Sequence, residues 1–262
     1  MEVPHLSWNE IIYEDPEGGK IVIWPHLPCI RMPSNLRYRN WNGLALLYSS
    51  DDIMLSKEEE KEEIKSPGMN VQAVIASGSM MSMMLKDIQN LEVDGPRIPD
   101  PEPMRLMMHA KNSENKSVYS IIPTIEDEEW ADWEGRWAHN QAKVMNLLST
   151  LTRSRRYSKN RIKAASRVQK AENINSELGA AAASCASWWM ESQRGIPREM
   201  MEERDIRFAS RVRGALADLR NRRVDDSDSS DLVLLVPVHQ AHLVQFANAI
   251  KKCETIEKIE ME

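Results

Sequence analysis

Short apolar runs of strand length alternate with longer stretches of helical spacing along this chain. The clearest runs are at 20–24, 44–48 and 232–236, and each is almost wholly apolar. Runs of this kind, separated by helical patterns, are typical of strands in a parallel sheet that is covered on both faces. We therefore predict that the three strands lie in one sheet. Two of them are closely followed by a histidine, His26 and His239, near opposite ends of the chain.

The middle of the chain has the spacing of amphipathic helices. Apolar residues recur at three- and four-residue steps from Trp130 to Leu151, and again over 199–219. Between them, 180–189 is a run of small residues that ends in two tryptophans, which predicts a closely packed helix. The predicted fold class is α/β, with a small mixed or parallel sheet covered by helices and a helix-rich middle section.

Proline content sets the predicted domain boundaries. The segment 94–103 holds four prolines, which remove backbone donors and fix the chain, so we predict that it holds neither a helix nor a central strand. We expect 1–93 to form an N-terminal α/β part and 94–129 to be a proline-rich linker or loop. The remainder, 130–262, is expected to be a helical segment plus a final strand and helix, packed with the N-terminal part in one compact domain.

Composition narrows the class of protein. Hydrophobic residues make up 42% of the chain and charged residues 28%, as in folded globular proteins. The three cysteines are far apart, which favours a reducing compartment over a disulfide framework. We find neither a secretory leader nor an apolar stretch of the roughly 20 residues that span a bilayer. We therefore expect a soluble, intracellular protein, for which a homo-oligomer stays open.

The two strand-end histidines are the first candidates for chemistry. Ligands of open α/β sheets bind at the carboxyl ends of the strands, where His26 and His239 are expected to meet. His242 follows at the start of the last predicted helix, so it can share a metal or a phosphate with His239. Isolated histidines after strands are also common as loop or core residues. We predict His26, His239 and His242 as metal ligands.

A charged triplet on the preceding helix adds to this group. In Glu203-Arg204-Asp205 the arginine can clamp a carboxylate or orient a histidine. The same triplet is also compatible with a solvated helix turn. We predict Glu203 and Arg204 as catalytic residues.

The order of these motifs resembles the TraB/GumN/Tiki group of metal-dependent hydrolases. His26 follows a Gly18-Gly19 turn and a short strand, as in the opening unit of that group, and Glu203-Arg204-Asp205 matches its helix motif. Val236-Pro237-Val238-His239 takes the place of the terminal Gly-x-Gly-His. The resemblance implies a hydrolase of the peptidase or esterase type. It would act on a small-molecule or peptide substrate with a divalent ion, Mn, Co or Zn.

The chain departs from the group's pattern at several positions. Leu47 stands where the group has a glutamate after its second strand. Bulkier residues, Ile23 and Trp24 before His26 and Pro237 before His239, replace small ones that let a ligand approach the backbone. These departures predict a member with a degenerate active site that binds metal poorly.

Two other function classes remain open from the sequence. The segment 153–170 holds eight cations and no acid, which on a helix would form a basic, solvent-exposed stripe for nucleic acid or a structural partner. The cations are Arg153, Arg155, Arg156, Lys159, Arg161, Lys163, Arg167 and Lys170. Tyr157 would be available for base stacking. Alternatively, the tryptophans at 130–137 would bind a protein partner, provided that they are exposed.

Overall fold

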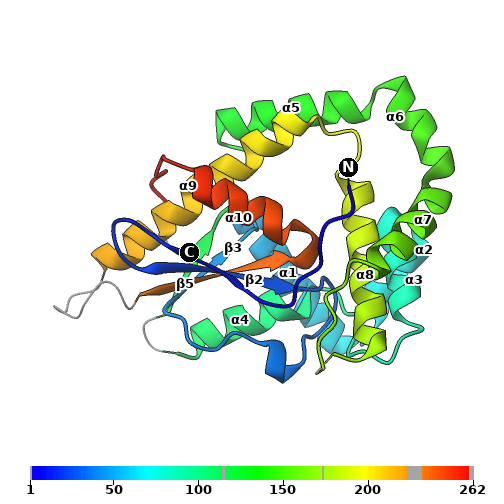
Figure 1. Cartoon of the computed structure of the whole chain (residues 1–262), viewed down its shortest axis with the longest axis horizontal. Helices are drawn as coiled ribbons and strands as arrows, with labels where there is room; N and C mark the ends of the chain where they lie inside the picture. The colour runs from blue at the N-terminus through cyan, green and yellow to red at the C-terminus, as the bar shows by residue number, and fades with distance from the viewer. Residues whose placement is uncertain (1, 114–115, 173, 223–231, 260–262) are drawn as a thin grey trace.

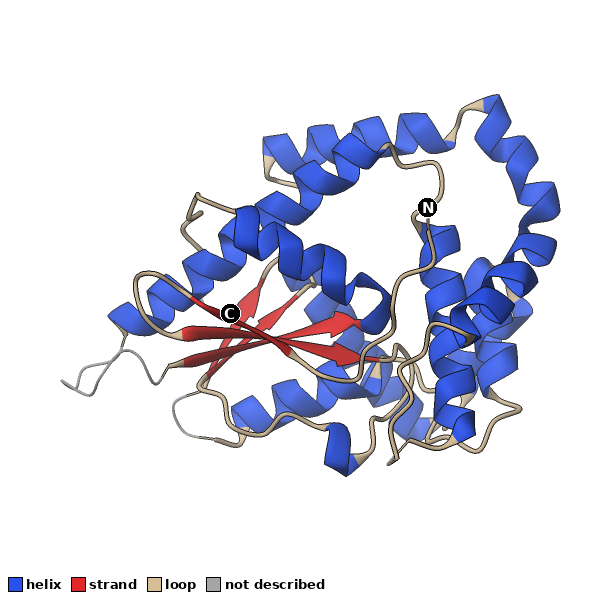
Figure 2. Ribbon diagram, in the orientation of Figure 1, coloured by secondary structure: helices blue, strands red, loops and turns tan. Residues whose placement is uncertain are grey.

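The computed structural model describes residues 2–113, 116–172, 174–222 and 232–259, and in these residues the strands form one sheet (Figure 2). The sheet has five strands in the order β1-β2-β5-β3-β4. Strands β2, β5, β3 and β4 are mutually parallel, and β1 pairs antiparallel with β2 across a glycine turn. The strands are β1 Ile11–Glu14, β2 Lys20–His26, β3 Gly43–Leu46, β4 Ser117–Ser120 and β5 Val233–His239. The predicted α/β class and the common sheet for the three apolar runs are confirmed.

Helices cover both faces of this sheet (Figure 1). They are α1 Ser50–Lys65, α2 Met69–Ala76, α3 Met80–Ile88, α4 Pro101–Lys111, α5 Glu128–Gln141, α6 Val144–Ser149, α7 Arg153–Ala165, α8 Ser176–Ser192, α9 Arg198–Asn221 and α10 Leu243–Lys252. Side chains alternate across the strands, so each strand contributes to two separate cores. Ile21 and Ile23 of β2 pack with α9 and α10, whereas Val22 and Trp24 pack with α1, α3, α4 and α8.

Prolines lie inside β2 and β5 without ending either strand. Pro25 pairs with Val238 and Pro237 with Trp24 in the parallel ladder. Each proline lies at a point where its strand has a paired strand on one side only. For Pro25 this is because β1 pairs with β2 only as far as Ile23. Likewise, the pairing of β3 with β5 ends two residues before Pro237. A missing backbone donor on an open edge leaves no ladder partner unsatisfied.

The segment 94–129 is not only a linker or loop, in contrast to the prediction. It contains α4 and the edge strand β4, and α4 begins inside the proline-rich stretch. Asp100 caps this helix and Pro101 occupies its first turn, where a backbone N–H has no helical partner in any case. Pro101 therefore begins a helix at a position where proline content predicted none.

The tryptophan-rich segment folds differently from the single amphipathic helix predicted over 130–151. It is divided between α5 and α6, and Val144, Leu147 and Leu148 of α6 lie on the surface. Trp130 and Trp133 are buried and stack on each other, with ring centroids 4.9 Å apart. Their burial removes the basis for a tryptophan-mediated partner site at these two positions.

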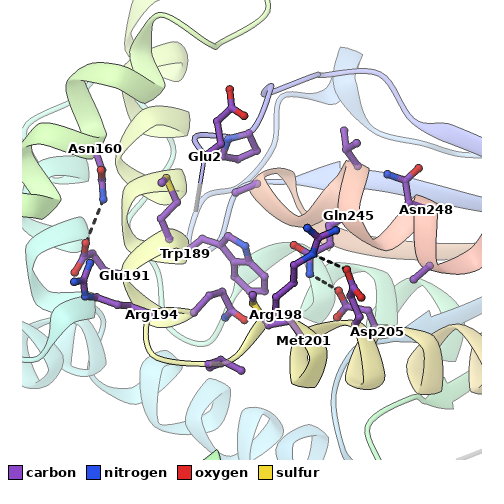
Figure 3. A pocket seen from close by; sticks show the side chains of 18 of the residues that line it. Glu2, Asn160, Trp189, Glu191, Arg194, Arg198, Met201, Asp205, Gln245 and Asn248 are labelled. Carbon is purple, nitrogen blue, oxygen red and sulfur yellow. Dashed lines mark hydrogen bonds and ion pairs between the residues drawn. The ribbon is translucent and has the colours of Figure 1, made fainter. Parts of the chain in front are cut away.

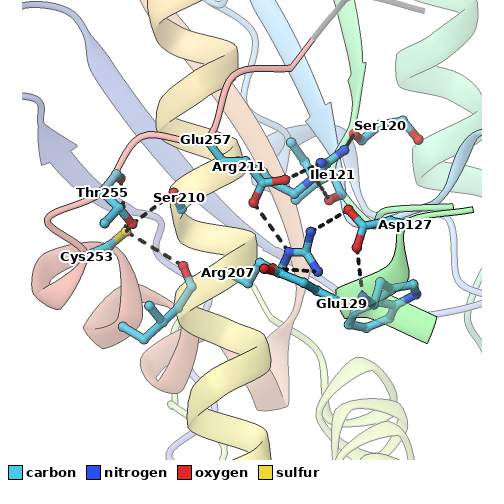
Figure 4. Close-up of polar contacts among 12 residues, drawn as sticks. Ser120, Ile121, Asp127, Glu129, Arg207, Ser210, Arg211, Cys253, Thr255 and Glu257 are labelled. Atoms are coloured by element: carbon cyan, nitrogen blue, oxygen red, sulfur yellow. Dashed lines mark hydrogen bonds and ion pairs between the residues drawn. The ribbon is translucent and has the colours of Figure 1, made fainter. Parts of the chain in front are cut away.

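Charged side chains hold the C-terminal segment against α9 (Figure 4). Arg207 and Arg211 both pair with Glu257, and Arg207 also pairs with Asp127, which caps α5. Arg211 donates to the backbone carbonyl of Ile121, just after β4. One helix thus joins the start of α5, the end of β4 and the C-terminal segment.

Gly214 in α9 is where this C-terminal segment comes closest to the helix. A methyl group at this position would overlap the backbone carbonyl oxygen of Glu257. Gly214→Ala is therefore expected to lower the free energy of unfolding by about 1–3 kcal/mol, in spite of alanine's better helix propensity. Urea denaturation measures the change.

Gly135 in α5 is the matched control, because an added methyl group there meets no atom within 4 Å. Gly135→Ala should raise stability by about 0.5–1 kcal/mol. Equal stabilisation by both substitutions would show that the C-terminal segment does not pack on Gly214.

Candidate metal centre

The two strand-end histidines lie side by side at the carboxyl edge of the sheet. His26 ends β2 and His239 ends β5, and the two residues are direct partners in the parallel register. Their ring centroids are 5.2 Å apart, and the ring planes meet at 67°. Both histidines lie on the sheet face that carries Trp24, because they follow the two-residue period of their strands. Residues separated by most of the sequence thus meet as the apolar runs predicted.

Asp100 completes this group from a different element. Its Oδ1 accepts from the backbone N–H of Glu102 at 3.4 Å as the N-cap of α4, and its Oδ2 lies 3.7 Å from Nδ1 of His26. One potential ligand atom from each of His26, Asp100 and His239 lies within 4.8 Å of the other two. His26 Nδ1 is buried and has no hydrogen-bond partner among the described residues. The three side chains therefore have the spacing of metal ligands, and His26 Nδ1 is a potential ligand atom without another partner.

Burial controls the protonation of this cluster. It lowers the pKa of His26 to about 4 and raises the pKa of Asp100 to about 8. The pKa of His239 is also lowered well below its ordinary value by burial, with His26 and His242 adding to the effect. Near pH 7 the cluster therefore holds two neutral imidazoles and a carboxyl group that is mostly protonated. A divalent ion would favour the ionised carboxylate, so its binding would release this proton.

Aromatic rings form the walls of the cluster. Trp24 stacks on His26 at a centroid distance of 6.0 Å, and Trp188 and Trp189 contact His239 at 5.6 and 5.5 Å. An apolar shell of this kind limits access of water and lowers the local dielectric.

His242 and Arg204 belong to a neighbouring network centred on Asp205. His242 Nε2 lies 3.1 Å from Asp205 Oδ2, and Arg204 reaches Oδ1 through Nε and Nη2 at 3.0 and 2.8 Å. Gln245 adds a hydrogen bond to the same carboxylate. The prediction of His242 as a third metal ligand is not supported, because its ring is directed to Asp205. Trp189 contacts both His239 and His242 and so lies between the two groups.

The Asp205 network predicts a loss of stability in acid. Burial alone would raise the pKa of Asp205, but His242 and Arg204 outweigh it and lower the pKa to about 2 from 3.8. A depressed carboxylate pKa stabilises the folded state above the unfolded pKa, and the stabilisation is lost as pH falls from about 4 to 2. We expect this residue to account for about 2 kcal/mol, measured as the stability difference between wild type and Asp205→Asn. A difference that does not shrink over this pH range would contradict the ion pairing.

Glu203 does not reach either group. Its side chain is about half exposed and pairs with Arg136 of α5, with one oxygen 3.2 Å from Nη1. The structure therefore does not support the predicted catalytic role of Glu203 in this cluster, because helix α9 turns Glu203 to the surface and Asp205 to the interior.

The basic segment is only partly available to a polyanion. Helix α7 ends at Ala165, so the last two cations of the predicted stripe, Arg167 and Lys170, lie beyond it. Three cations are held by acids, in the pairs Arg156–Glu191, Arg161–Asp87 and Arg167–Glu2. Tyr157 is buried and donates to Asp87, so it is not available for base stacking. These contacts favour a structural role for the face of α7 that carries Arg156, Tyr157 and Arg161. Binding of nucleic acid stays a prediction for the opposite, solvent-exposed face.

Comparisons with known proteins were made against family models, curated proteins and solved structures. None matches. The likeness to the TraB/GumN/Tiki group therefore rests on the sequence motifs and remains a prediction.

Sequence reasoning did not identify Asp100 as a site residue. It took the proline-rich stretch as a loop, although Asp100-Pro101-Glu102 is a helix-start signal with an N-cap aspartate and proline in the first turn. The position that the resemblance assigns to an acid, Leu47, instead packs against the core on the α9 side of the sheet. The carboxylate of the cluster thus comes from α4 and not from the end of β3.

Proposed function

We propose that the protein is a divalent-metal-dependent hydrolase of the peptidase or esterase type, with His26, Asp100 and His239 as metal ligands. The observation that carries the proposal is the convergence of these three side chains around a buried imidazole nitrogen of His26 that has no hydrogen-bond partner among the described residues. The order of the motifs along the chain supports the hydrolase class. The Asp205 network would position the aromatic wall beside the ligands.

The donor set suits catalysis as well as binding. Two histidines and one carboxylate recur in catalytic metal sites, where three protein ligands leave a coordination position for substrate. A divalent ion held there supplies Lewis-acid polarisation of a carbonyl group and activates water near neutral pH. His26 and His239 offer neutral imidazoles, and Asp100 would contribute a negative charge once the ion displaces its proton. The surrounding indoles limit the access of bulk solvent.

A combined binding and activity experiment tests this function. Mn²⁺, Co²⁺ and Zn²⁺ would be titrated into metal-free protein by calorimetry, and each metal form assayed on peptide and ester substrates. His239→Asn should weaken binding at least about 100-fold and remove any turnover, because a ligand is lost. Glu203→Gln is the control, and it should change neither quantity because Glu203 lies on the surface.

The outcomes separate three accounts. Binding with turnover that needs His239 supports the hydrolase. Binding without turnover identifies a relative that keeps the site and has lost the reaction. Turnover that survives loss of both histidines, or the absence of metal binding, contradicts the assignment.

Leu47→Glu distinguishes Asp100 from the position that the resemblance favours. Because Leu47 packs on the sheet face opposite His26 and His239, a glutamate there should not strengthen metal binding. The same calorimetric titration measures this. A gain in affinity of about tenfold or more would mean that position 47 reaches the site and that Asp100 is not the carboxylate ligand.

A further inference from the structure

A cavity of about 1010 Å³ lies beside the aromatic wall of the metal centre (Figure 3). Residues of the N-terminal segment, α7, the end of α8, the start of α9 and α10 line it. Trp189 and Met190 provide apolar surface, whereas Asn160, Gln245 and Asn248 provide hydrogen-bonding groups. A pocket of this size, with apolar walls and a few convergent polar groups, is typical of sites for small ligands.

The acids of this cavity are already neutralised. Each of the four that line it is paired with an arginine, in the pairs Glu2–Arg167, Glu191–Arg156, Glu202–Arg198 and Asp205–Arg204. Asn160 adds a hydrogen bond to Glu191, as Figure 3 shows. The acids therefore leave little negative charge to repel an anion.

Four cations that line the cavity have no such partner. Lys159, Lys163, Arg194 and Lys252 form no ion pair within the described residues. Lys159 and Lys163 are four residues apart, so they lie on the same face of α7. Arg194 follows α8, and Lys252 ends α10. Three separate elements thus bring uncompensated positive charge to one cavity.

We propose that this cavity binds a small ligand that carries two or more phosphate or carboxylate groups. Lysine and arginine hold such groups through charge-assisted hydrogen bonds. Trp189 lines the cavity and also contacts His239, so a bound ligand lies next to the metal centre. That this ligand is the substrate rests on the proposed function, whereas the binding itself does not.

Two pairs of cations on the same helix provide a matched test. Lys159→Gln with Lys163→Gln removes two cations from the cavity. Arg153→Gln with Arg155→Gln removes the same charge from α7 at positions that do not line it. Inorganic tripolyphosphate and citrate would be titrated calorimetrically into each variant at low and high salt. The Asp100→Asn background is used throughout, so that chelation of a bound metal contributes no heat.

We expect the cavity pair to weaken binding of at least one probe about tenfold or more, because two charge-assisted contacts are lost, and the control pair to change it by less than about twofold. Equal weakening by both pairs would overturn the proposal, since it would mean unspecific attraction to a basic helix, as for a nucleic-acid surface. Absence of binding in the parent protein, or unchanged binding in both pairs, would overturn it as well. The proposed function is tested separately in a protein that has the Lys159→Gln and Lys163→Gln substitutions but keeps Asp100. Metal ions titrated into this protein should bind as in the parent, because the two lysines are not metal ligands.

Discussion

Asp100→Asn is expected to abolish metal binding while stabilising the metal-free protein. Asparagine caps a helix about as well as aspartate, so α4 keeps its start. The variant lacks the negative charge that a divalent ion requires, and we expect its affinity to fall at least about 100-fold. Thermal unfolding with and without Mn²⁺, Co²⁺ or Zn²⁺ measures this, because a ligand that binds only the folded state raises the midpoint.

The stability change of the metal-free protein has a defined pH dependence. The pKa of Asp100 is raised by burial from 3.8 to about 8, so its ionisation favours the unfolded state increasingly between these values. Asp100→Asn should therefore add little at pH 4 and roughly 2–5 kcal/mol at pH 8, as followed by urea denaturation after metal removal. An equal effect at both pH values would show that the carboxyl group is not desolvated.

Asp205→Ala is expected to destabilise the fold by about 3–5 kcal/mol. Asp205 is buried and accepts contacts from Arg204, His242 and Gln245, so its removal leaves the charge of Arg204 uncompensated in the interior. The loss should also loosen the contact of His242 with Trp189, because the carboxylate holds that ring in place.

Glu203→Ala on the same helix is the control for this substitution. Its ion pair with Arg136 is exposed, and such pairs contribute at most about 1 kcal/mol. Equilibrium urea denaturation at pH 7 compares the two variants. Similar free energies of unfolding for both would contradict the buried network.

The sheet could be predicted because its strands carry a local signal. The apolar runs that became β2 and β5 are short, and each ends in a histidine, so their parallel pairing brings His26 and His239 together. Strand β4 carries no comparable signal, since Ser117–Ser120 is only four residues long, with Val118 and Tyr119 between two serines, at the edge of the sheet. Its place depends on pairing with β3, which sequence periodicity does not encode.

The candidate site was harder to predict because its membership depends on where each side chain points in the folded protein. Glu203 and Asp205 are two residues apart on one helix, yet one lies at the surface and the other is buried. His242 is close in sequence to His239 but turns to a different partner. Asp100 lies in a segment whose prolines pointed to a loop. A helix N-cap that faces a strand end is a contact between distant elements, and the spacing of residues along the chain does not reveal it.

The most direct test of the metal centre is anomalous diffraction from crystals of the full chain soaked with Mn²⁺, Co²⁺ or Zn²⁺. The account predicts one strong peak between His26, Asp100 and His239, about 2.0–2.2 Å from a nitrogen of each imidazole and from a carboxylate oxygen. It also predicts that the peak is absent in Asp100→Asn. Anomalous density at another site only, or no density between the three side chains at saturating metal concentration, would contradict it.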